Sequence, residues 1–161
     1  MPTKFKIRDA SGWTIFVFGF LALLLGLVGL VRPETLLSLL GFPVLERAAR
    51  AAGDYTLLFM TASAMASFNM GAYYIFAALN DVKQFYKWTV PFRAITFIVF
   101  TLAVASQLAP AGFFGVGAWE LAGAAATFLA LRSDHKKKME MTGVTTNSLA
   151  PRSKTKKEAG G

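Results

Sequence analysis

The chain contains no cysteine, and His135 is its one histidine among 161 residues. The missing cysteines exclude disulfides, thiolate nucleophiles, iron–sulfur ligation and thiolate zinc sites. A single histidine cannot supply a bis-histidine haem or a metal site built from several imidazoles. No loop carries oxygen ligands at the spacing that a hard cation requires. The sequence therefore predicts that this chain holds no metal and no cofactor.

Charged residues are also scarce, at 16% of the chain against 55% hydrophobic residues. A soluble domain usually contains about 25% charged residues. The charges that are present lie mainly in the first ten residues, in the connections and after Leu131. Between them lie apolar runs close to the ~20 residues that are needed to cross a bilayer. This pattern is typical of an integral membrane protein.

The apolar runs predict an all-α fold, a transmembrane four-helix bundle with spans at about residues 13–31, 55–79, 88–108 and 113–131. Residues 1–12 form a polar N-terminal segment, and residues 80–87 form a polar connection. Residues 132–161 form a basic tail, which we expect to be disordered after about residue 141 because it has no apolar period there. Pro33 predicts a short helix that ends near Gly41 and lies either at the membrane surface or against the bundle.

The basic residues predict the orientation of the spans. Thirteen of the 17 Lys and Arg residues lie in the N-terminal segment, the 80–87 connection and the tail, whereas Arg32, Arg47 and Arg50 lie in the connection on the other side. The positive-inside rule then places both termini in the cytoplasm. The net charge of +8 is explained by this bias and by contact with anionic lipid, so no nucleic-acid partner is expected.

Small residues recur at spacings that allow close helix contact. We expect these rows to face other helices of the same chain, and their use in a homodimer remains open. The rows comprise Gly19 and Gly26 in the first run, Ser63, Ser67 and Gly71 in the second, and Ala118, Ala122, Ala126 and Ala130 in the fourth.

Three polar residues interrupt the apolar runs at membrane depth: Asn69, Arg93 and Glu120. From the helix rise, Asn69 and Glu120 lie roughly 15 Å from the cytoplasmic ends of their spans, and Arg93 about 8 Å. Tyr73 and Tyr74 share the shallower level. A carboxylate at the bilayer centre is costly, so Glu120 is expected to bond to Asn69 or to pair with Arg93. Alternatively, Arg93 snorkels to the headgroups. The five residues form the predicted cluster, either a ligand-binding site or a structural lock.

Several short motifs of the chain resemble those of a known group of proteins. The motifs are Gly-Leu-Val-Arg-Pro-Glu ending at Glu34, Asn69 with Tyr73-Tyr74, Phe92-Arg93, and Gly-Ala-Trp-Glu-Leu-Ala-Gly-Ala at residues 117–124. With them, the chain from Trp13 to Leu131 is similar to the small four-helix bacterial membrane proteins known as BphX-like and DoxX-like. The resemblance implies a four-helix fold in a bacterial inner membrane. Some members of the group accompany aromatic catabolism, and others associate with quinone-linked oxidoreductases.

Three functions are consistent with these features. The favoured hypothesis is a non-enzymatic bundle that binds a hydrophobic small molecule, or a partner membrane protein, through the predicted cluster. A second is an accessory subunit of a quinone-linked oxidoreductase that contacts quinone through Tyr73, Tyr74, Arg93 and Glu120. A third is a small transporter in which Glu120 carries a proton and the chain dimerises. An independent enzyme is disfavoured because the sequence shows no nucleophile–base pair or phosphate-binding loop.

Overall fold

A computed structural model describes residues 6–148 of the chain, with side chains described for residues 6–142. This part of the chain is helical and contains no strand, which confirms the all-α prediction. The helices are α1 (Ala10–Val31), α2 (Pro33–Leu39), α3 (Thr56–Leu79), α4 (Lys83–Ala105) and α5 (Phe113–Ser148), with a 3-10 turn, η1 (Arg47–Ala49), between α2 and α3.

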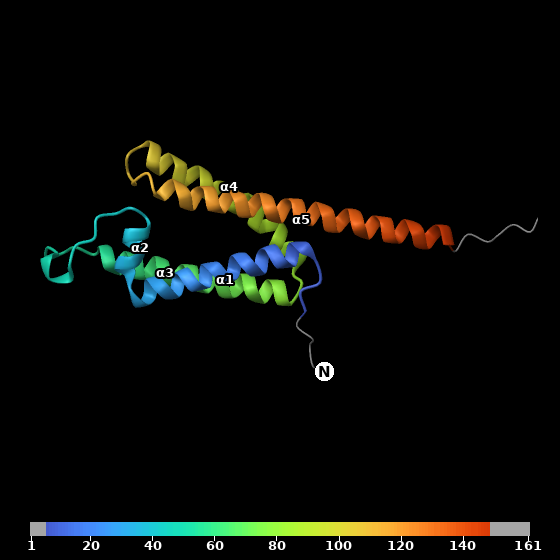
Figure 1. Ribbon diagram of the computed structural model, residues 1–161, viewed down its shortest axis with the longest axis horizontal. Coiled ribbons are helices and arrows are strands. Elements are labelled where there is room, and N and C mark those ends of the chain that lie inside the picture. Colours follow the sequence, from blue (N-terminus) through green and yellow to red (C-terminus); the bar gives the residue numbers. More distant parts are fainter. Residues whose placement is uncertain (1–5, 149–161) are drawn as a thin grey trace, which may run out of the picture.

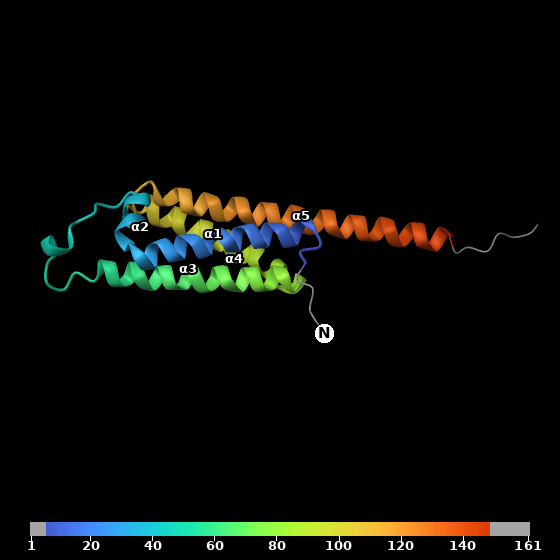
Figure 2. The ribbon, with the colours of Figure 1, turned by 60° about the horizontal axis from the view of Figure 1, so that its bottom comes forward.

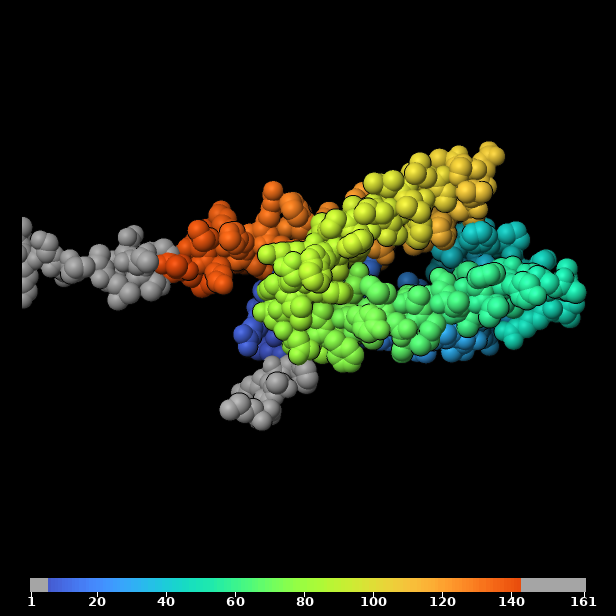
Figure 3. Space-filling view, turned by 180° about the vertical axis from the view of Figure 1, so that it is seen from behind, coloured from blue at the N-terminus to red at the C-terminus, as the bar shows by residue number. Residues whose placement is uncertain are grey.

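The four long helices form two antiparallel pairs, α1 with α3 and α4 with α5 (Figures 1 and 2). The pairs meet near the start of α1 and diverge toward the end that carries α2. Seen from behind, the space-filling surface shows an open wedge between α4 and α3 (Figure 3). The fold is therefore a closed bundle at one end and an open one at the other.

Three helices in the described part are long and apolar enough to cross a membrane: Ala10–Val31, Lys83–Ala105 and Phe113–Thr142. The 24-residue α3 is not among them, although it contains no charged residue. Its serines, its tyrosines and Asn69 lower its hydropathy. The structure thus supports three of the four expected spans by length and composition.

Glycines bring α1 and α3 into close contact. A Cβ atom on Gly26 would lie 2.5 Å from the backbone nitrogen of Phe68, and one on Gly71 would lie 2.5 Å from the nitrogen of Leu23. Any side chain at these positions would force the two backbones apart. The hydroxyl of Ser67 also donates to the carbonyl oxygen of Ala22 at 3.0 Å. The predicted small-residue rows of these two helices are confirmed as helix-packing surfaces at Gly19, Gly26, Ser67 and Gly71, whereas Ser63 is exposed.

The prediction that the small-residue row of α5 faces other helices is wrong in part. Ala130 is buried, but Ala122 and Ala126 are exposed. The buried positions of α5 follow a different face, which includes Gly117, Ala124 and Thr127. The reason is that α5 contacts both α4 and α1, so its buried face is set by two neighbours rather than by one row.

The short helix α2 packs against the bundle. Leu37 is buried, and the side chain of Leu36 fills the space above Gly29 of α1. Gly41 ends the helix with a φ of +81°, a conformation that glycine adopts without strain. Of the two predicted positions for this helix, contact with the bundle is therefore the one observed.

A polar network closes the bundle where α1 begins. The Asp9 carboxylate accepts hydrogen bonds from the Gly12 N–H at 2.9 Å and from the Lys83 ammonium, and so caps α1. The Asp134 carboxylate of α5 accepts from the Ser11 N–H at 3.0 Å. Partial burial raises the pKa of Asp9, but its hydrogen bonds to Lys83 and Gly12 outweigh this effect and hold the pKa below its usual value of 3.8. The network ties α1, α4 and α5 together at one level.

Two helix boundaries correct the sequence prediction. The polar connection expected at residues 80–87 is shorter, because α4 already begins at Lys83. The last apolar run does not end its helix at Leu131, since α5 continues to Ser148. Residues 142–148, which were expected to be disordered, are described as the last part of α5, and residues 149–161 lie outside the described part of the chain.

Candidate functional site

An ion pair lies between α4 and α5. The Nε of Arg93 donates to Oε2 of Glu120 at 3.1 Å, and the Arg93 side chain is only 3% exposed. The guanidinium carbon lies 3.1 Å from the centroid of the Phe18 ring of α1 and 5.9 Å from that of Tyr74 of α3. One buried cation of α4 therefore contacts side chains from the three other long helices.

Local sequence makes room for this cation. Gly123 lies one turn after Glu120, and a Cβ atom there would collide with a terminal guanidinium nitrogen of Arg93. On the same helix, the Trp119 ring stacks on Phe18, with 5.5 Å between centroids and 15° between planes. The Phe18–Trp119 stack thus covers one side of the ion pair.

The ion pair leaves donor capacity unused. Both terminal nitrogens of Arg93 are buried and have no hydrogen-bond partner among the described residues. A buried pair of this kind is weak evidence for net stability, because desolvation offsets much of the attraction between its charges. Its clear structural effect is to fix α4 and α5 in one register beside α1.

The predicted cluster is only partly assembled. Arg93, Glu120 and Tyr74 come together, whereas Tyr73 is 58% exposed. Asn69 is partly exposed, and its side chain makes no hydrogen bond in the described part of the chain. Pairing of Glu120 with Asn69 is therefore wrong. Snorkelling of Arg93 is also wrong, because its guanidinium is buried and paired.

Sequence reasoning missed three contributors to this site: Phe18, Trp119 and Gly123. Trp119 and Gly123 flank Glu120 on α5, so their proximity in sequence was an available signal. Phe18 had no such signal, because its position depends on how α1 packs against α5. The site therefore extends to a fourth helix that the sequence pattern did not connect with Arg93.

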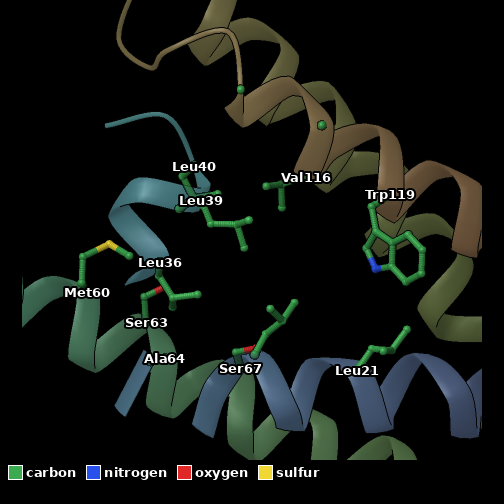
Figure 4. Close-up of a pocket in the computed structure, with 13 residues that line it drawn as sticks. Leu21, Leu36, Leu39, Leu40, Met60, Ser63, Ala64, Ser67, Val116 and Trp119 are labelled. Carbon is green, nitrogen blue, oxygen red and sulfur yellow. The ribbon is translucent and has the colours of Figure 1, made fainter. Parts of the chain in front are cut away.

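A cavity opens beside the Phe18–Trp119 stack, between the two helix pairs (Figure 4). Its volume is about 590 Å³, and its walls come from α1, α2, α3 and α5. The lining residues are Leu21, Leu25, Leu36, Leu39, Leu40, Met60, Ser63, Ala64, Ser67, Gly112, Gly115, Val116 and Trp119.

The polar groups in this cavity are few. The Ser67 hydroxyl is already bonded to the Ala22 carbonyl. The Ser63 hydroxyl and the Trp119 indole N–H make no hydrogen bond within the described residues, and Figure 4 shows the indole nitrogen facing the cavity. The cavity thus offers an apolar wall with two unused donors.

The chain matches no protein-family model, and no curated protein or solved structure is significantly similar to it. The BphX-like and DoxX-like resemblance stays a prediction, as do the functions that it implies. Within the described residues, no three His, Asp or Glu side chains come together in a way that could hold a metal ion.

Proposed function

We propose that the chain is a multi-pass membrane protein in which α3 is a fourth span beside α1, α4 and α5. The 24 residues of α3 extend about 36 Å, which exceeds the ~30 Å hydrocarbon core. Helix α3 lacks charged residues, and its small residues Ala64, Ser67 and Gly71 pack on α1. Its low hydropathy is thus explained by close helix contact, which favours small residues in membranes.

Both termini are proposed to lie in the cytoplasm. The basic residues Lys83, Lys87 and Arg132 gather at the end of the bundle where α1 begins, and the positive-inside rule assigns this end to the cytoplasm. A fluorescent protein fused after Ser148 should be bright, and alkaline phosphatase fused there should be inactive. The opposite pair of signals would contradict the orientation.

Within this membrane protein, the cavity is proposed to bind one hydrophobic small molecule that carries a hydrogen-bond acceptor. The observation that carries this proposal is the ~590 Å³ volume with an apolar wall and two free donors, Ser63 and Trp119. Binding sites for small molecules usually have about 300–1,000 Å³ and a few polar groups that orient the ligand. A carbonyl, ester or ether oxygen would satisfy these donors.

The same cavity favours binding over catalysis. None of its described lining residues carries a titratable side chain. Proton transfer and nucleophilic attack need such groups within hydrogen-bond reach of the ligand. The buried Arg93 lies behind the Phe18–Trp119 stack and does not line the cavity. We therefore assign the ion pair a structural role and place ligand contact at Trp119 and Ser63.

The test compares small molecules that purify with the protein. A Ser63→Trp variant should fill the cavity, and Leu102→Trp places the same indole side chain outside it, on the exposed face of α4. Both variants and the wild type are purified in mild detergent, and apolar compounds are identified by mass spectrometry. A compound retained by the wild type and by Leu102→Trp should fall at least about tenfold in Ser63→Trp.

Thermal melting of each variant shows whether the fold is retained. If the wild type retains nothing beyond the bulk phospholipid that Ser63→Trp also retains, the cavity is a lipid-exposed groove and the proposal is wrong.

A further inference from the structure

A second cleft lies between α4 and α5, at the end of the bundle where α1 begins. Its volume is about 480 Å³. Basic or imidazole side chains line one part of it, namely Lys87, Arg132 and His135, and no acidic side chain lines it. Its apolar part is formed by Val90, Pro91, Phe128 and Leu131. The cleft thus has a basic rim, formed by Lys87, Arg132 and His135, and an apolar floor, formed by Val90, Pro91, Phe128 and Leu131.

The positive charge of this rim is not neutralised within the described residues. Lys83, one turn before Lys87, already pairs with Asp9 and Asp81. Asp134 faces the start of α1, where it accepts from Ser11. Lys87 and Arg132 have no carboxylate partner, and Arg132 instead lies over the Phe128 ring at 4.4 Å from its centroid. The rim therefore has charge available for an anionic ligand.

The position of the cleft indicates which anion it fits. Trp13 and Trp88 are both about half exposed near the same end of the bundle, and exposed tryptophans are typical of the headgroup level of a membrane. From Lys87 the floor continues along α4 and α5, two of the helices long and apolar enough to cross a bilayer. An acyl chain can follow this floor while its phosphate contacts the rim.

We infer that the cleft between α4 and α5 binds an anionic phospholipid. The phosphate lies among Lys87, Arg132 and His135, and one acyl chain packs on Val90, Pro91 and Phe128. Basic pockets between membrane helices recognise anionic headgroups in this way, through charge at the rim and apolar contact below it. The inference rests on the proposed membrane placement of α4 and α5, and it is independent of the ligand of the larger cavity.

The experiment measures lipid binding to the full chain in nonionic detergent by native mass spectrometry. The probes are phosphatidylglycerol and phosphatidylcholine with identical acyl chains. The wild type should bind phosphatidylglycerol at least about tenfold more tightly, because two basic residues contact its uncompensated phosphate. Equal affinities for the two lipids would overturn the inference, and this comparison needs no variant to fold.

Two charge variants locate the site. Lys87→Gln with Arg132→Gln should abolish the preference for phosphatidylglycerol, whereas Lys137→Gln with Lys138→Gln removes equal charge further along α5 and should preserve it. Equal losses in both variants would show attraction by overall charge and would overturn the site.

Competition with millimolar glycerol 3-phosphate distinguishes a lipid from a soluble phosphate. The soluble compound should leave bound phosphatidylglycerol in place, since it lacks the acyl chain that packs on the floor. Complete displacement would assign the cleft to a soluble phosphate and would overturn the lipid.

Discussion

Replacing one member of the Arg93–Glu120 pair should be far more harmful than replacing both. Arg93→Met removes the cation and leaves the Glu120 carboxylate, whose side chain is 20% exposed, without its partner between α4 and α5. Glu120→Leu removes the carboxylate and leaves a guanidinium that is 3% exposed, with neither terminal nitrogen hydrogen-bonded in the described structure. Each single change leaves one charged side chain without its partner in a low-dielectric interior.

The size of the effect follows from this burial. Breaking a buried ion pair by removing one partner costs about 3–5 kcal/mol, whereas apolar replacement of the whole pair is often neutral. The two single losses would thus sum to roughly 6–10 kcal/mol, and the double variant should lose less than either single variant. Glu120→Gln should be milder than Glu120→Leu, because its carbonyl oxygen can still accept from Nε of Arg93.

The assay is unfolding in detergent micelles with increasing sodium dodecyl sulfate, followed by circular dichroism. The free energies of unfolding of the wild type, both single variants and the double variant form a double-mutant cycle. Lys137→Met, an exposed change on the α5 extension, is the control for loss of a cation and should change stability by less than about 0.5 kcal/mol. If the single losses add within about 0.5 kcal/mol, the residues are not coupled and the ion-pair reasoning is refuted.

Two further predictions concern the helix contacts. Gly26→Ala should lower the free energy of unfolding by about 1–3 kcal/mol, because its Cβ would lie 2.5 Å from the Phe68 backbone nitrogen. Gly115→Ala, whose Cβ would have no atom within 4 Å, should raise the free energy of unfolding by up to about 1 kcal/mol. If Gly115→Ala lost as much stability as Gly26→Ala, the close packing at Gly26 would be contradicted. Because the pKa of Asp9 is lowered in the fold, the ionised carboxylate contributes to the stability of the folded protein at pH values above its usual pKa of 3.8. This contribution is lost as the pH falls through the pKa that Asp9 has in the folded protein. Asp9→Asn, which also weakens the bond to Lys83, should therefore reduce stability near neutral pH and flatten the acid dependence, and an unchanged pH profile would count against this capping role.

The helices themselves could be predicted because hydrophobic runs and their interruptions are local properties of the chain. The runs at residues 13–31 and 113–131 lie within α1 and α5, and Pro33 correctly marked the start of α2. The ends were less predictable, since polar residues can continue a helix beyond its apolar part. Lys83 and Arg132 are such residues, and both lie inside helices that were expected to begin later or end earlier.

The levels of Arg93 and Glu120 in the bundle were estimated from the sequence as different. With the span expected to begin at Trp88, Arg93 was placed about 8 Å from its cytoplasmic end, and Glu120 was placed deeper. In the structure the guanidinium of Arg93 lies against Gly123, one turn from Glu120, and its Nε still reaches the Glu120 carboxylate. The sequence identified both residues, and the long side chain of Arg93 joins their two levels.

The sequence by itself determined which side chains need a polar or charged partner in an apolar environment, because burial of an unpaired charge is unfavourable wherever it occurs. It could not determine which way each helix turns about its axis. Asn69 and Tyr74 are five residues apart, or about 140° around α3, so only one of them can face Arg93. Tertiary packing made that choice through the close approach of α1 to α3, which also brought Phe18 over the guanidinium. The cavity has the same origin, since its walls come from four helices and exist only where the two pairs diverge.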